Sequence, residues 1–345
     1  MALLDTVTDT SSYLPPANVT TINREFVKDI VTIIDPVAVP LLDLIAGGVA
    51  ESTIHQFAVD SLPALVTNVS TGDIDVDGVN TNGLDEGFEP NFSGTGSPYS
   101  AQPQRLTNVV QIFGAKFAAS DSLQRSRSLV GVKDPIAHEK MKAMQTMRKA
   151  MERRMFEPTN FTDYSVGSAT LPRRMRALIK WIDETGFALN QVTANGQLTP
   201  DLIDQGAEAC KNSGGRPTHL FVGVGTKFDL SRQLRSTVSS TQTVINTSNI
   251  DANEMRIIRS VDWYVTDGGP IQIVSDFQIP ESNSTSGGGL AWLLEVGKLS
   301  WDTYVPLQDV PLAKTGYNTK GLLAEEATYA FYQPASSCVF HQVTT

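Results

Sequence analysis

The chain has 345 residues, of which 41% are hydrophobic, and its 37 acidic and 27 basic side chains give a formal net charge of -10 at pH 7. This length and composition are sufficient for the buried core of one or two globular domains. The negative charge excludes a protein that binds nucleic acid over its whole surface, because such binding requires clustered lysine and arginine. It leaves room for basic patches of limited extent.

The beginning of the sequence lacks targeting signals. Residues 1–16 have neither the basic start nor the apolar run of a secretory signal, and no apolar stretch in the chain approaches the length that spans a bilayer. We therefore expect a protein that is made and kept in a cytosol and has no membrane partner. In that reducing compartment Cys210 and Cys338, which are far apart in the sequence, are expected to be free buried thiols rather than a disulfide.

The first part of the chain is predicted to be extended. Residues 1–37 are polar and rich in turn-forming residues, which indicates an arm with one short helix at Asn23–Ile34. Hydrophobic and polar residues alternate after Ile54 and again over Arg105–Ala119, as they do in strands.

Between these two strand-like runs, Thr71–Ser100 is dense in Gly, Asn, Asp, Ser and Pro. A segment with so few apolar anchors cannot bury itself, so it is either disordered or ordered by docking on another molecule. Ser52–Ala119 is therefore predicted to be a long two-stranded excursion with a polar tip.

A long amphipathic helix is predicted over Asp134–Glu157. Asp134 is a suitable N-cap, Pro135 fits the first helical position, and Pro158 forces the residue before it out of the helical region. An apolar face arises from residues that recur at steps of three and four: Ala137, Met141, Met144, Met147, Met151 and Met155. We expect this face to pack in the core, because the flexible methionine side chain fills irregular gaps. The other faces carry mainly lysine and arginine.

The remaining sequence predicts several shorter elements around a polar loop at Ser236–Asn253. Helices are expected at Pro172–Glu184, Thr199–Lys211 and Thr226–Arg235, and strands at Thr218–Gly225, Met255–Val265, Ile271–Ile279, Leu290–Val296, Leu322–Tyr332 and Cys338–Val343. Because helices precede most of the strands, the predicted fold class is α+β rather than alternating α/β.

One segment matches the opening of a calcium loop. Asp73–Gly78 has carboxylates at alternate positions and a glycine at the sixth position, but the twelfth position, which should hold a bidentate glutamate, is Leu84. The same spacing is the period of a strand, so we favour a β-ribbon that shows Asp73, Asp75 and Asp77 on one face. No metal site is predicted here.

No motif predicts catalysis or a cofactor. Gly223–Lys227 lies between a strand and a helix, but it lacks the third glycine of the dinucleotide fingerprint and the spacing of a phosphate-binding loop. His55, His138, His219 and His341 are scattered without metal-ligand spacing. Neither a G-x-S-x-G elbow nor a family context for a nucleophilic cysteine occurs. We expect a structural protein without a cofactor rather than an enzyme.

Several stretches, in this order, resemble the major capsid proteins of tailed bacteriophages. They are VPLLDLIAGGVAESTIHQFAVDSLPA (Val39–Ala64), QRLTNVVQIFGAKFAASDSLQ (Gln104–Gln124), KMKAMQTMRKAMERRMF (Lys140–Phe156), and the later pair DWYVTDGGPIQIVSDFQI and LSWDTYVPLQDVPLAKTGYNTKGLLAEEATYAF. Arm, extended loop, long helix, mixed region and final strands follow one another as they do in that family, and the resemblance covers most of the chain.

The resemblance implies a domain organisation and a function. It implies an N-terminal arm at 1–51, an E-loop at 52–119 that lies over a neighbouring subunit, a peripheral domain with a spine helix at 120–185, an axial domain at 186–253, and return strands of the peripheral domain at 254–345. The subunit is expected to self-assemble as hexamers and pentamers into an icosahedral phage head enclosing double-stranded DNA. Its expected location is the virion capsid, assembled in the host bacterial cytoplasm.

The resemblance also implies partners. Some members of the family carry a scaffolding segment ahead of the arm, for which this chain has no room, so a separate scaffolding protein is expected, together with a portal, optional decoration proteins and packaged DNA contacted non-specifically. Crosslinking through an E-loop lysine is not expected, because no lysine occurs between Lys28 and Lys116.

Charge placement suggests how neighbouring subunits meet. An acidic ribbon against a basic surface of the next subunit would give complementary charge. The candidate residues of this contact are the acidic set Asp73, Asp75 and Asp77 and the basic set Arg173, Arg174 and Arg176.

Two other classes of protein stay open. An encapsulin-like compartment shell shares this fold class, and it would hold protein cargo instead of DNA. A calcium-binding surface or adhesion protein would use Asp73–Gly78, but it would need a secretion signal that the sequence lacks.

Overall fold

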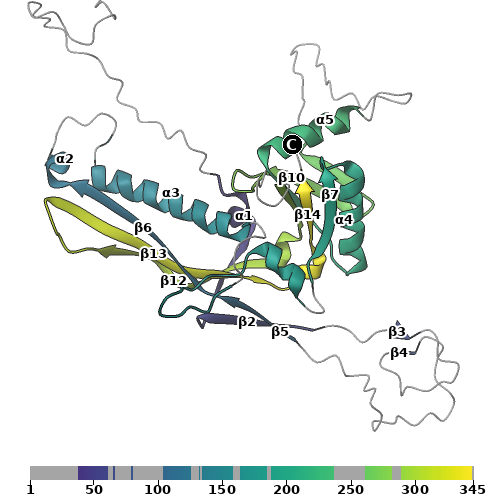
Figure 1. Ribbon diagram of the computed structural model, residues 1–345, viewed down its shortest axis with the longest axis horizontal. Helices are drawn as coiled ribbons and strands as arrows, with labels where there is room; N and C mark the ends of the chain where they lie inside the picture. The colour runs from purple at the N-terminus through teal and green to yellow at the C-terminus, as the bar shows by residue number, and fades with distance from the viewer. Residues whose placement is uncertain are drawn as a thin grey trace, which may run out of the picture.

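A computed structural model describes residues 38–60, 65–66, 79–80, 104–125, 132, 134–157, 164–184, 188–236, 261–281 and 289–343. The predicted arm with its helix at Asn23–Ile34, the acidic residues Asp73, Asp75 and Asp77, and the loop from residue 237 to Asn253 lie outside these residues. The described chain forms a long lobe, a round lobe and a thin ribbon that extends away from both (Figure 1).

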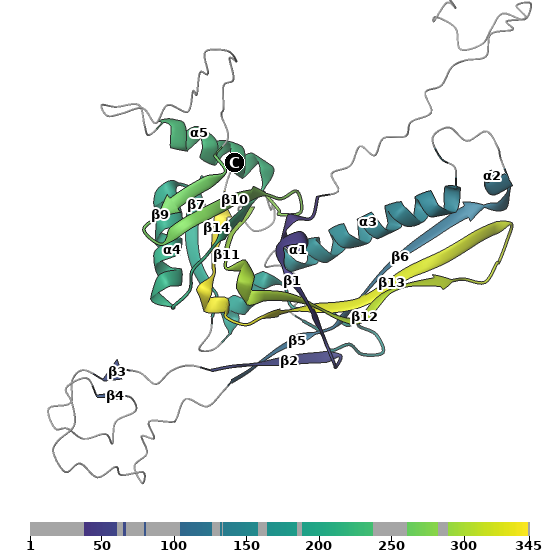
Figure 2. The same cartoon turned by 180° about the vertical axis from the view of Figure 1, so that it is seen from behind.

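The long lobe is built on a four-stranded sheet in the order β1-β12-β13-β6. Its strands are β1 (Ala46–Val49), β12 (Leu299–Pro311), β13 (Asn318–Phe331) and β6 (Gln111–Ser120), with β1 parallel to β12 and the other neighbours antiparallel. In β6, Phe113 and Phe117 are buried, whereas the alternate residues Ile112 and Lys116 are exposed. The buried face packs against the helix α3 (Pro135–Met155), and both views show α3 lying along β6 and β13 (Figures 1 and 2).

The long helix forms where it is predicted. Asp134 Oδ1 accepts hydrogen bonds from the N–H groups of Ile136 and Ala137, at 2.9 and 3.3 Å, and so caps the start of α3. In its second half the methionine face is in the core, as expected: Met147, Met151 and Met155 are buried.

The predicted burial is wrong for the first half of the methionine face. Ala137 is exposed, and Met141 and Met144 are 40% and 39% exposed. Here the helix packs on β6 and β13 through Ile136 and Ala143 instead. A repeat of about 3.5 residues drifts around a straight α-helix by roughly 20° per heptad, so its first members leave the line of contact.

The round lobe is built on a six-stranded sheet in the order β7-β14-β11-β8-β10-β9. Its strands are β7 (Asn190–Gly196), β14 (Cys338–Val343), β11 (Gly289–Leu294), β8 (His219–Val222), β10 (Gly269–Ser275) and β9 (Trp263–Thr266). The helices α4 (Pro200–Asn212) and α5 (Val224–Ser236) share a core with one face of this sheet. On the other face, the ring of Phe156 at the end of α3 lies 6.1 Å from Phe221 and 6.0 Å from Trp292. The sheet is therefore buried on both faces.

Most predicted elements of the round lobe are confirmed, and the mixture of separate helices and strands agrees with the α+β class. β8, β10, β11 and β14 stand where strands are expected, as does β13 of the long lobe, and α4 and α5 stand where helices are expected. β9, β10, β11 and β14 belong to one sheet with β7 and β8, so the expected division near residue 253 does not coincide with a division between sheets. β1, β7 and β12 were not predicted, because β7 is polar and β12 contains prolines.

The prediction of a helix over Pro172–Glu184 is wrong for most of that range. Only a 3₁₀ turn, η1 (Leu178–Asp183), forms. The preceding N–H groups donate outside this segment: Arg174 to the carbonyl of Ser165, Met175 to Gln111 Oε1 and Arg176 to Asn108 Oδ1. Together with the backbone bridge between Ser165 and Arg174, these bonds hold the segment in an extended conformation up to Ala177.

The run Arg105–Ala119 forms two strands instead of one. β5 (Gln104–Val109) and β6 are separated at Val110, whose N–H donates to the carbonyl of Thr53. β5 belongs to the ribbon, whereas β6 belongs to the four-stranded sheet.

The two cysteines are buried and free, as predicted. Cys210 on α4 and Cys338 on β14 pack in the same core, and a hydrogen bond with Cys210 together with burial raises the pKa of the Cys338 thiol. Two residues that are distant in the sequence are thus neighbours in the fold.

We expect neither thiol to react with a chromogenic disulfide reagent while the subunit is folded, because the reaction needs an exposed thiolate. The folded subunit should react at least about 100-fold more slowly than the chain in guanidinium chloride, since access requires the round lobe to open. Stopped-flow absorbance at pH 8 measures both rates. Rapid labelling of the folded subunit would show that this lobe opens readily and would contradict the prediction.

Candidate functional site

The ribbon pairs β2 (Ile54–Val59) with β5 in antiparallel fashion, from Ile54 opposite Val109 to Val59 opposite Gln104. This pairing confirms the predicted two-stranded stem. Beyond it, only β3 (Leu65–Val66) and β4 (Val79–Asn80) are described, as a short parallel pair. A two-stranded ribbon is at best marginally stable alone, so contacts at its base must fix its direction.

An aromatic cluster forms the first of these contacts. The ring of Phe57 on β2 lies 6.0 Å from the ring of Trp181 and 5.5 Å from that of Tyr332. The indole N–H of Trp181 donates to the hydroxyl of Tyr329 at 2.8 Å. Ring pairs in this range of distance add to the stabilisation from burial.

Asn108 on β5 forms the second contact and is completely buried. Its amide donates to the carbonyl of Tyr329 at 2.8 Å, and its Oδ1 accepts from the N–H groups of Arg176 and Val109, each at 2.8 Å. One side chain therefore joins the ribbon, the strand β13 and the segment before η1.

The third contact joins a histidine and a carboxylate. His55 Nε2 on β2 lies 2.8 Å from Asp302 Oδ2 on β12, and the hydroxyl of Ser300 donates to the other carboxylate oxygen at 2.8 Å. Histidine and serine both contact the aspartate, which differs from a catalytic triad, where serine must contact histidine. The cluster ties the ribbon to the long lobe.

The three arginines expected at a subunit contact differ in their exposure. Arg173 pairs with Glu326 of β13 at 2.7 Å. Arg174 forms a backbone bridge with Ser165, and its side chain is half-buried. Both lie near the base of the ribbon, because Arg176, two residues after Arg174, donates its N–H to Asn108 Oδ1 on β5.

Arg176 has a role inside the subunit. It is 9% exposed, and its guanidinium lies 4.8 Å from the ring of Tyr164 and 4.6 Å from the ring of Trp181. It also donates to Glu184 Oε2 at 2.5 Å. Because Trp181 belongs to the aromatic cluster, this stacking supports the base of the ribbon from inside the same subunit.

On the side opposite α3, the ribbon covers the four-stranded sheet around Asp302, whereas the part around Ile112 and Lys116, hereafter the open face, is exposed (Figures 1 and 2). Lys116, Leu322 and Val310 lie opposite one another on β6, β13 and β12, and they form one row across this face. Ile112, in the same strand as Lys116, is 54% exposed. The open face is thus a mixed apolar and basic surface.

A buried carboxyl pair lies where α1 (Pro40–Leu44) meets α3. Glu152 Oε1 accepts from the N–H of Leu41 at 2.6 Å, and Asp276 Oδ1 accepts from the N–H of Gln278 at 2.7 Å. Both side chains are completely buried, and their remaining oxygens lack a donor among the described residues. Burial and the adjacent Asp276 raise the pKa of Glu152 to about 9, and burial also raises the pKa of Asp276. A proton held between the two carboxyls satisfies both.

The glycine turn Gly223–Lys227 leads from β8 into α5, as predicted. The N–H of Gly225 donates to the carboxylate of Glu281, and a Cβ at Gly223 would lie 2.2 Å from Glu281 Cγ. The carboxylate occupies the position at a helix N-terminus where a phosphate would bind. The turn is a structural connection closed by the chain itself.

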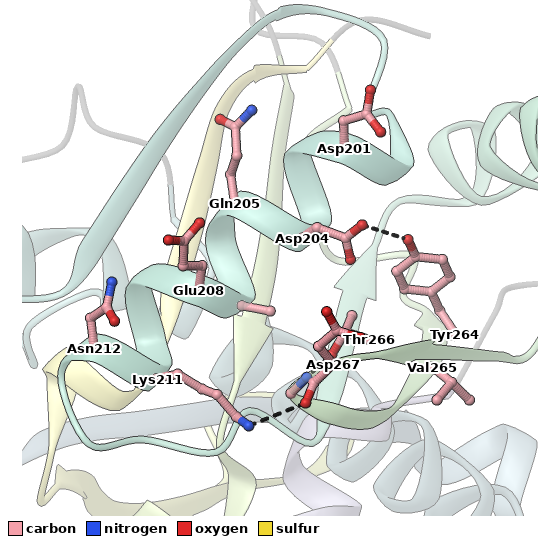
Figure 3. A pocket seen from close by; sticks show the side chains of 12 residues that line it. Asp201, Asp204, Gln205, Glu208, Lys211, Asn212, Tyr264, Val265, Thr266 and Asp267 are labelled. Atoms are coloured by element: carbon pink, nitrogen blue, oxygen red, sulfur yellow. Dashed lines mark hydrogen bonds between the residues drawn. The ribbon is translucent and has the colours of Figure 1, made fainter.

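The largest hollow that we describe, about 570 Å³, lies between α4 and the β9–β10 hairpin (Figure 3). The hydroxyl of Tyr264 donates to Asp204 at 3.0 Å, and the ammonium of Lys211 donates to the carbonyl of Asp267 at 3.3 Å, so the two walls are tied together. Burial and the neighbouring Asp204 raise the pKa of Tyr264 to about 12. The side chains of Lys211 and Tyr264 are thus both engaged in the contacts that join the walls of the hollow.

Metal-binding geometry is absent from the described residues, where no three side chains of His, Cys, Asp or Glu come together to hold an ion. Burial lowers the pKa of His219 and of His341, which favours neutral imidazoles within the round lobe. The calcium-like segment Asp73–Gly78 lies outside the described residues.

Among the helices of the described residues, none has the length and apolar character that a membrane span requires.

Both the sequence and the fold of this chain are similar to those of known proteins. A family model described as SU10 major capsid protein matches residues 14–344. A search of curated proteins finds no match. Among solved structures, the capsid asymmetric unit of cyanophage A-1(L) is 13% identical, with 95% of this chain and 99% of that chain covered and a TM-score of 0.62.

Two further solved structures share the fold at low sequence identity. A chain of Mycobacterium phage Che8 is 9% identical, with 95% of this chain and 100% of that chain covered and a TM-score of 0.55. The SrpI encapsulin complex from Synechococcus elongatus is 13% identical, with 91% and 93% covered and a TM-score of 0.50. The fold is therefore that of phage capsid subunits, and because the family model spans nearly the whole sequence, the chain belongs to the SU10 major capsid protein family.

Proposed function

We propose that this major capsid protein, a structural component of the virion, self-assembles as hexamers and pentamers into an icosahedral head enclosing double-stranded DNA. The observation that supports this proposal is the β2–β5 ribbon, which is anchored at its base by Phe57, Asn108 and His55 and extends beyond both lobes (Figure 1). An element with a fixed direction and no core of its own is stabilised when it docks on another copy of the chain. We also propose that the protein does not catalyse a reaction.

The lobes suggest how the family's domains map onto this chain. In our proposal residues 1–51 form the arm, α3 is the spine helix and the long lobe is the peripheral domain. The E-loop runs from residue 52 to Val109 rather than Ala119, because β6 pairs with β13. The round lobe is the axial domain, and it includes β9, β10, β11 and β14 because they share its sheet.

Electron microscopy of the purified protein at assembly concentration tests the proposal. Closed shells or ring-shaped capsomers are the expected result, and a monodisperse monomer at every concentration would contradict it. The contents of shells isolated from cells separate the two shell functions: DNA is expected in a phage head, whereas enclosed protein cargo would favour an encapsulin-like compartment, the second candidate suggested by the fold.

Partners follow from the same proposal. We propose that assembly in the host bacterial cytoplasm uses a separate scaffolding protein and a portal, that decoration proteins can bind the finished shell, and that packaged DNA is contacted without sequence specificity. The net charge of -10 is consistent with DNA contact through limited patches only.

We further propose that Asp73, Asp75 and Asp77 of one subunit face a basic surface of the next. The structure favours Arg174, with Lys116 on the open face, as the accessible part of that surface. Arg173 is paired with Glu326, and Arg176 is buried against Trp181, so Arg176 supports the surface from inside.

Charge reversal tests this contact. The triple change Asp73→Lys, Asp75→Lys and Asp77→Lys is expected to slow or block assembly while the subunit stays folded. Each exposed pair contributes only about 0.2 to 1 kcal/mol, but a shell repeats the contact many times. Light scattering follows assembly, and circular dichroism checks the fold.

A compensating change makes the test specific. Reversing Arg174 and Lys116 to glutamate in the triple variant should partly restore the rate, whereas replacing the three aspartates by asparagine should give an intermediate rate. Assembly of the triple variant at the wild-type rate over a range of salt concentrations would place these aspartates in solvent and remove the proposed contact.

A further inference from the structure

An apolar groove lies along α3 and reaches β12. Two hollows, of about 300 and 240 Å³, form this groove, and Met144 lines both of them. Met141 and Met144 belong to the part of the methionine face that has left the core, and they are 40% and 39% exposed. Leu307 of β12 lines the second hollow and is 41% exposed. We call this surface the α3–β12 groove.

The charged side chains of the groove are paired within the subunit. Lys140 of α3 pairs with Asp309 of β12, and Arg148 of α3 pairs with Asp43 of α1 at 2.6 Å. Burial raises the pKa of Glu325, the carboxyl in the second hollow, which favours its uncharged form. Both cations that line the hollows are thus neutralised by their own subunit, so the groove suits an apolar occupant better than an acidic one.

A groove with this chemistry fits the apolar face of a helix. Contiguous exposed apolar side chains mark a contact surface, and methionine adapts its shape to the group that packs on it. Amphipathic helices bind in such grooves through residues spaced three and four apart. The occupant should therefore be a short segment with apolar residues at that spacing.

The N-terminal arm, which lies outside the described residues, contains a sequence of this kind. In the helix predicted over Asn23–Ile34, charged residues and Thr32 share one side. The other side is formed by apolar residues at steps of three and four: Phe26, Val27, Ile30, Val31, Ile33 and Ile34. A helix of this length is marginally stable alone in water, so it needs a surface on which to pack.

The position of this segment in the chain matches the groove. Pro36 ends the predicted helix, and Ala38 is the first described residue, so the helix must end within about 14 Å of Ala38. Ala38 leads into α1, whose Leu42 lines the groove. The predicted helix is about 18 Å long, close to the roughly 21 Å of α3 that Ala137–Met151 covers along the groove.

We infer that the helix predicted over Asn23–Ile34 packs its apolar face into the α3–β12 groove of its own subunit. The short connection to α1 favours the same subunit over a neighbour, and it also sets the direction of the helix. Ile34 then lies at the α1 end of the groove, and Ile30, one turn earlier, approaches Met144. This contact goes beyond the proposed function, because it forms within one subunit and needs no assembly.

Oxidation of methionines by peroxide in the unassembled full-length subunit tests the inference. Ile30→Asp places a charge in the apolar face, so the arm should leave the groove, and the oxidation rates of Met141 and Met144 should rise about 10-fold over the wild type. Mass spectrometry of peptides measures each rate. Met147 and Met151 are buried against the sheet, and their unchanged rates would show that the variant is folded.

A matched variant provides the control. Thr32→Asp adds the same charge to the polar side of the predicted helix and should leave the rates of Met141 and Met144 unchanged. Equal rates of these methionines in the wild type and in Ile30→Asp would show that the arm does not cover the groove and would overturn the inference.

Crosslinking of the unassembled subunit identifies whose arm fills the groove. Ile30→Cys with Met144→Cys, treated with a short bismaleimide, should give a linked peptide pair in the monomer band, whereas a mixture of the two single variants should give no dimer. Ile30→Cys with Lys142→Cys is the control and should give no linked pair, because residues two apart lie on different sides of α3. Cys210 and Cys338 are buried and add no background. Dimers in the mixture would place another copy's arm in the groove and would overturn the inference, as would a double variant without the link.

Discussion

Replacing Glu152 by glutamine is expected to remove most of the pH dependence of the subunit's stability between about pH 4.5 and 9. Burial and Asp276 raise the pKa of Glu152 from 4.5 to about 9, so the folded state holds a proton that the unfolded state has released. The folded state then binds more protons in this range, and the stability of the wild-type subunit falls as the pH rises through it. The loss amounts to several kcal/mol at the alkaline end, at about 1.4 kcal/mol per pKa unit.

The glutamine variant avoids this loss because its amide needs no proton. Its oxygen can still accept from the N–H of Leu41, and its NH2 group can donate to Asp276 as the protonated acid does. The variant should therefore match the wild type near pH 5 and become increasingly more stable than the wild type above pH 7. Urea unfolding of the unassembled subunit across this range measures the difference.

An exposed carboxylate of the same helix serves as the control. Glu139, paired at the surface with Lys142, can be changed to glutamine, and this variant should keep the wild-type pH dependence. Parallel pH profiles for the wild type and Glu152→Gln would show that the buried pair is not protonated in the folded state.

Replacing Asn108 by alanine is expected to destabilise the subunit by about 2 to 5 kcal/mol. The change leaves the carbonyl of Tyr329 and the N–H of Arg176 buried without their partner, at a cost of about 1 to 3 kcal/mol for each group. Because Asn108 joins the ribbon to β13, the ribbon should also become more accessible to protease than the lobes.

Chemical unfolding and limited proteolysis measure these two effects separately. Thr107→Ala, a change at the adjacent and partly exposed position of β5, should cost less than about 1 kcal/mol and leave the cleavage pattern unchanged. Equal stability of Asn108→Ala and Thr107→Ala would mean that water replaces the lost partner, and the proposed role of Asn108 in fixing the ribbon would then fail.

Local signals in the sequence were sufficient for much of the fold. The start of α3 could be predicted because a cap residue and a proline act on neighbouring backbone groups, and α4 could be predicted for the same reason, with Thr199 accepting from the N–H of Leu202. The stem of the ribbon was also predictable, since β2 and β5 show the alternation of half-buried strands.

Interactions between distant residues account for the errors. The segment before η1 has a helical pattern, but its N–H groups bind Gln111 and Asn108, which no pattern within that segment reveals. The exposure of Met141 arises because the methionine repeat drifts around α3, so that Ile136 and Ala143 contact the sheet in its place. The pairing of Glu152 with Asp276 was likewise hidden, because only the packing of α3 against the segment after β10 brings these residues together.

The residues of the candidate site also include some that local sequence signals indicate and others whose surroundings arise only on folding. Arg173 and Arg174 were chosen from charge alone and are half-buried, whereas the burial of Arg176 depends on Tyr164 and Trp181, which approach it only in the folded chain. Asn108 carried one usable signal, a lone amide in the apolar run LTNVV, and a polar residue in such a position is usually hydrogen-bonded. The docking of Asp73, Asp75 and Asp77 stays a prediction.

The position of β14 has a consequence for synthesis. This strand, Cys338–Val343, lies between β7 and β11 in the interior of the six-stranded sheet, although β7 is made much earlier. A nascent chain therefore cannot close the round lobe until residue 343 has left the ribosome exit tunnel, because β7 lacks its neighbour until then. Growing chains on one polysome should expose incomplete sheets instead of finished contact surfaces. Translation itself thus delays the meeting of subunits until β14 has been made.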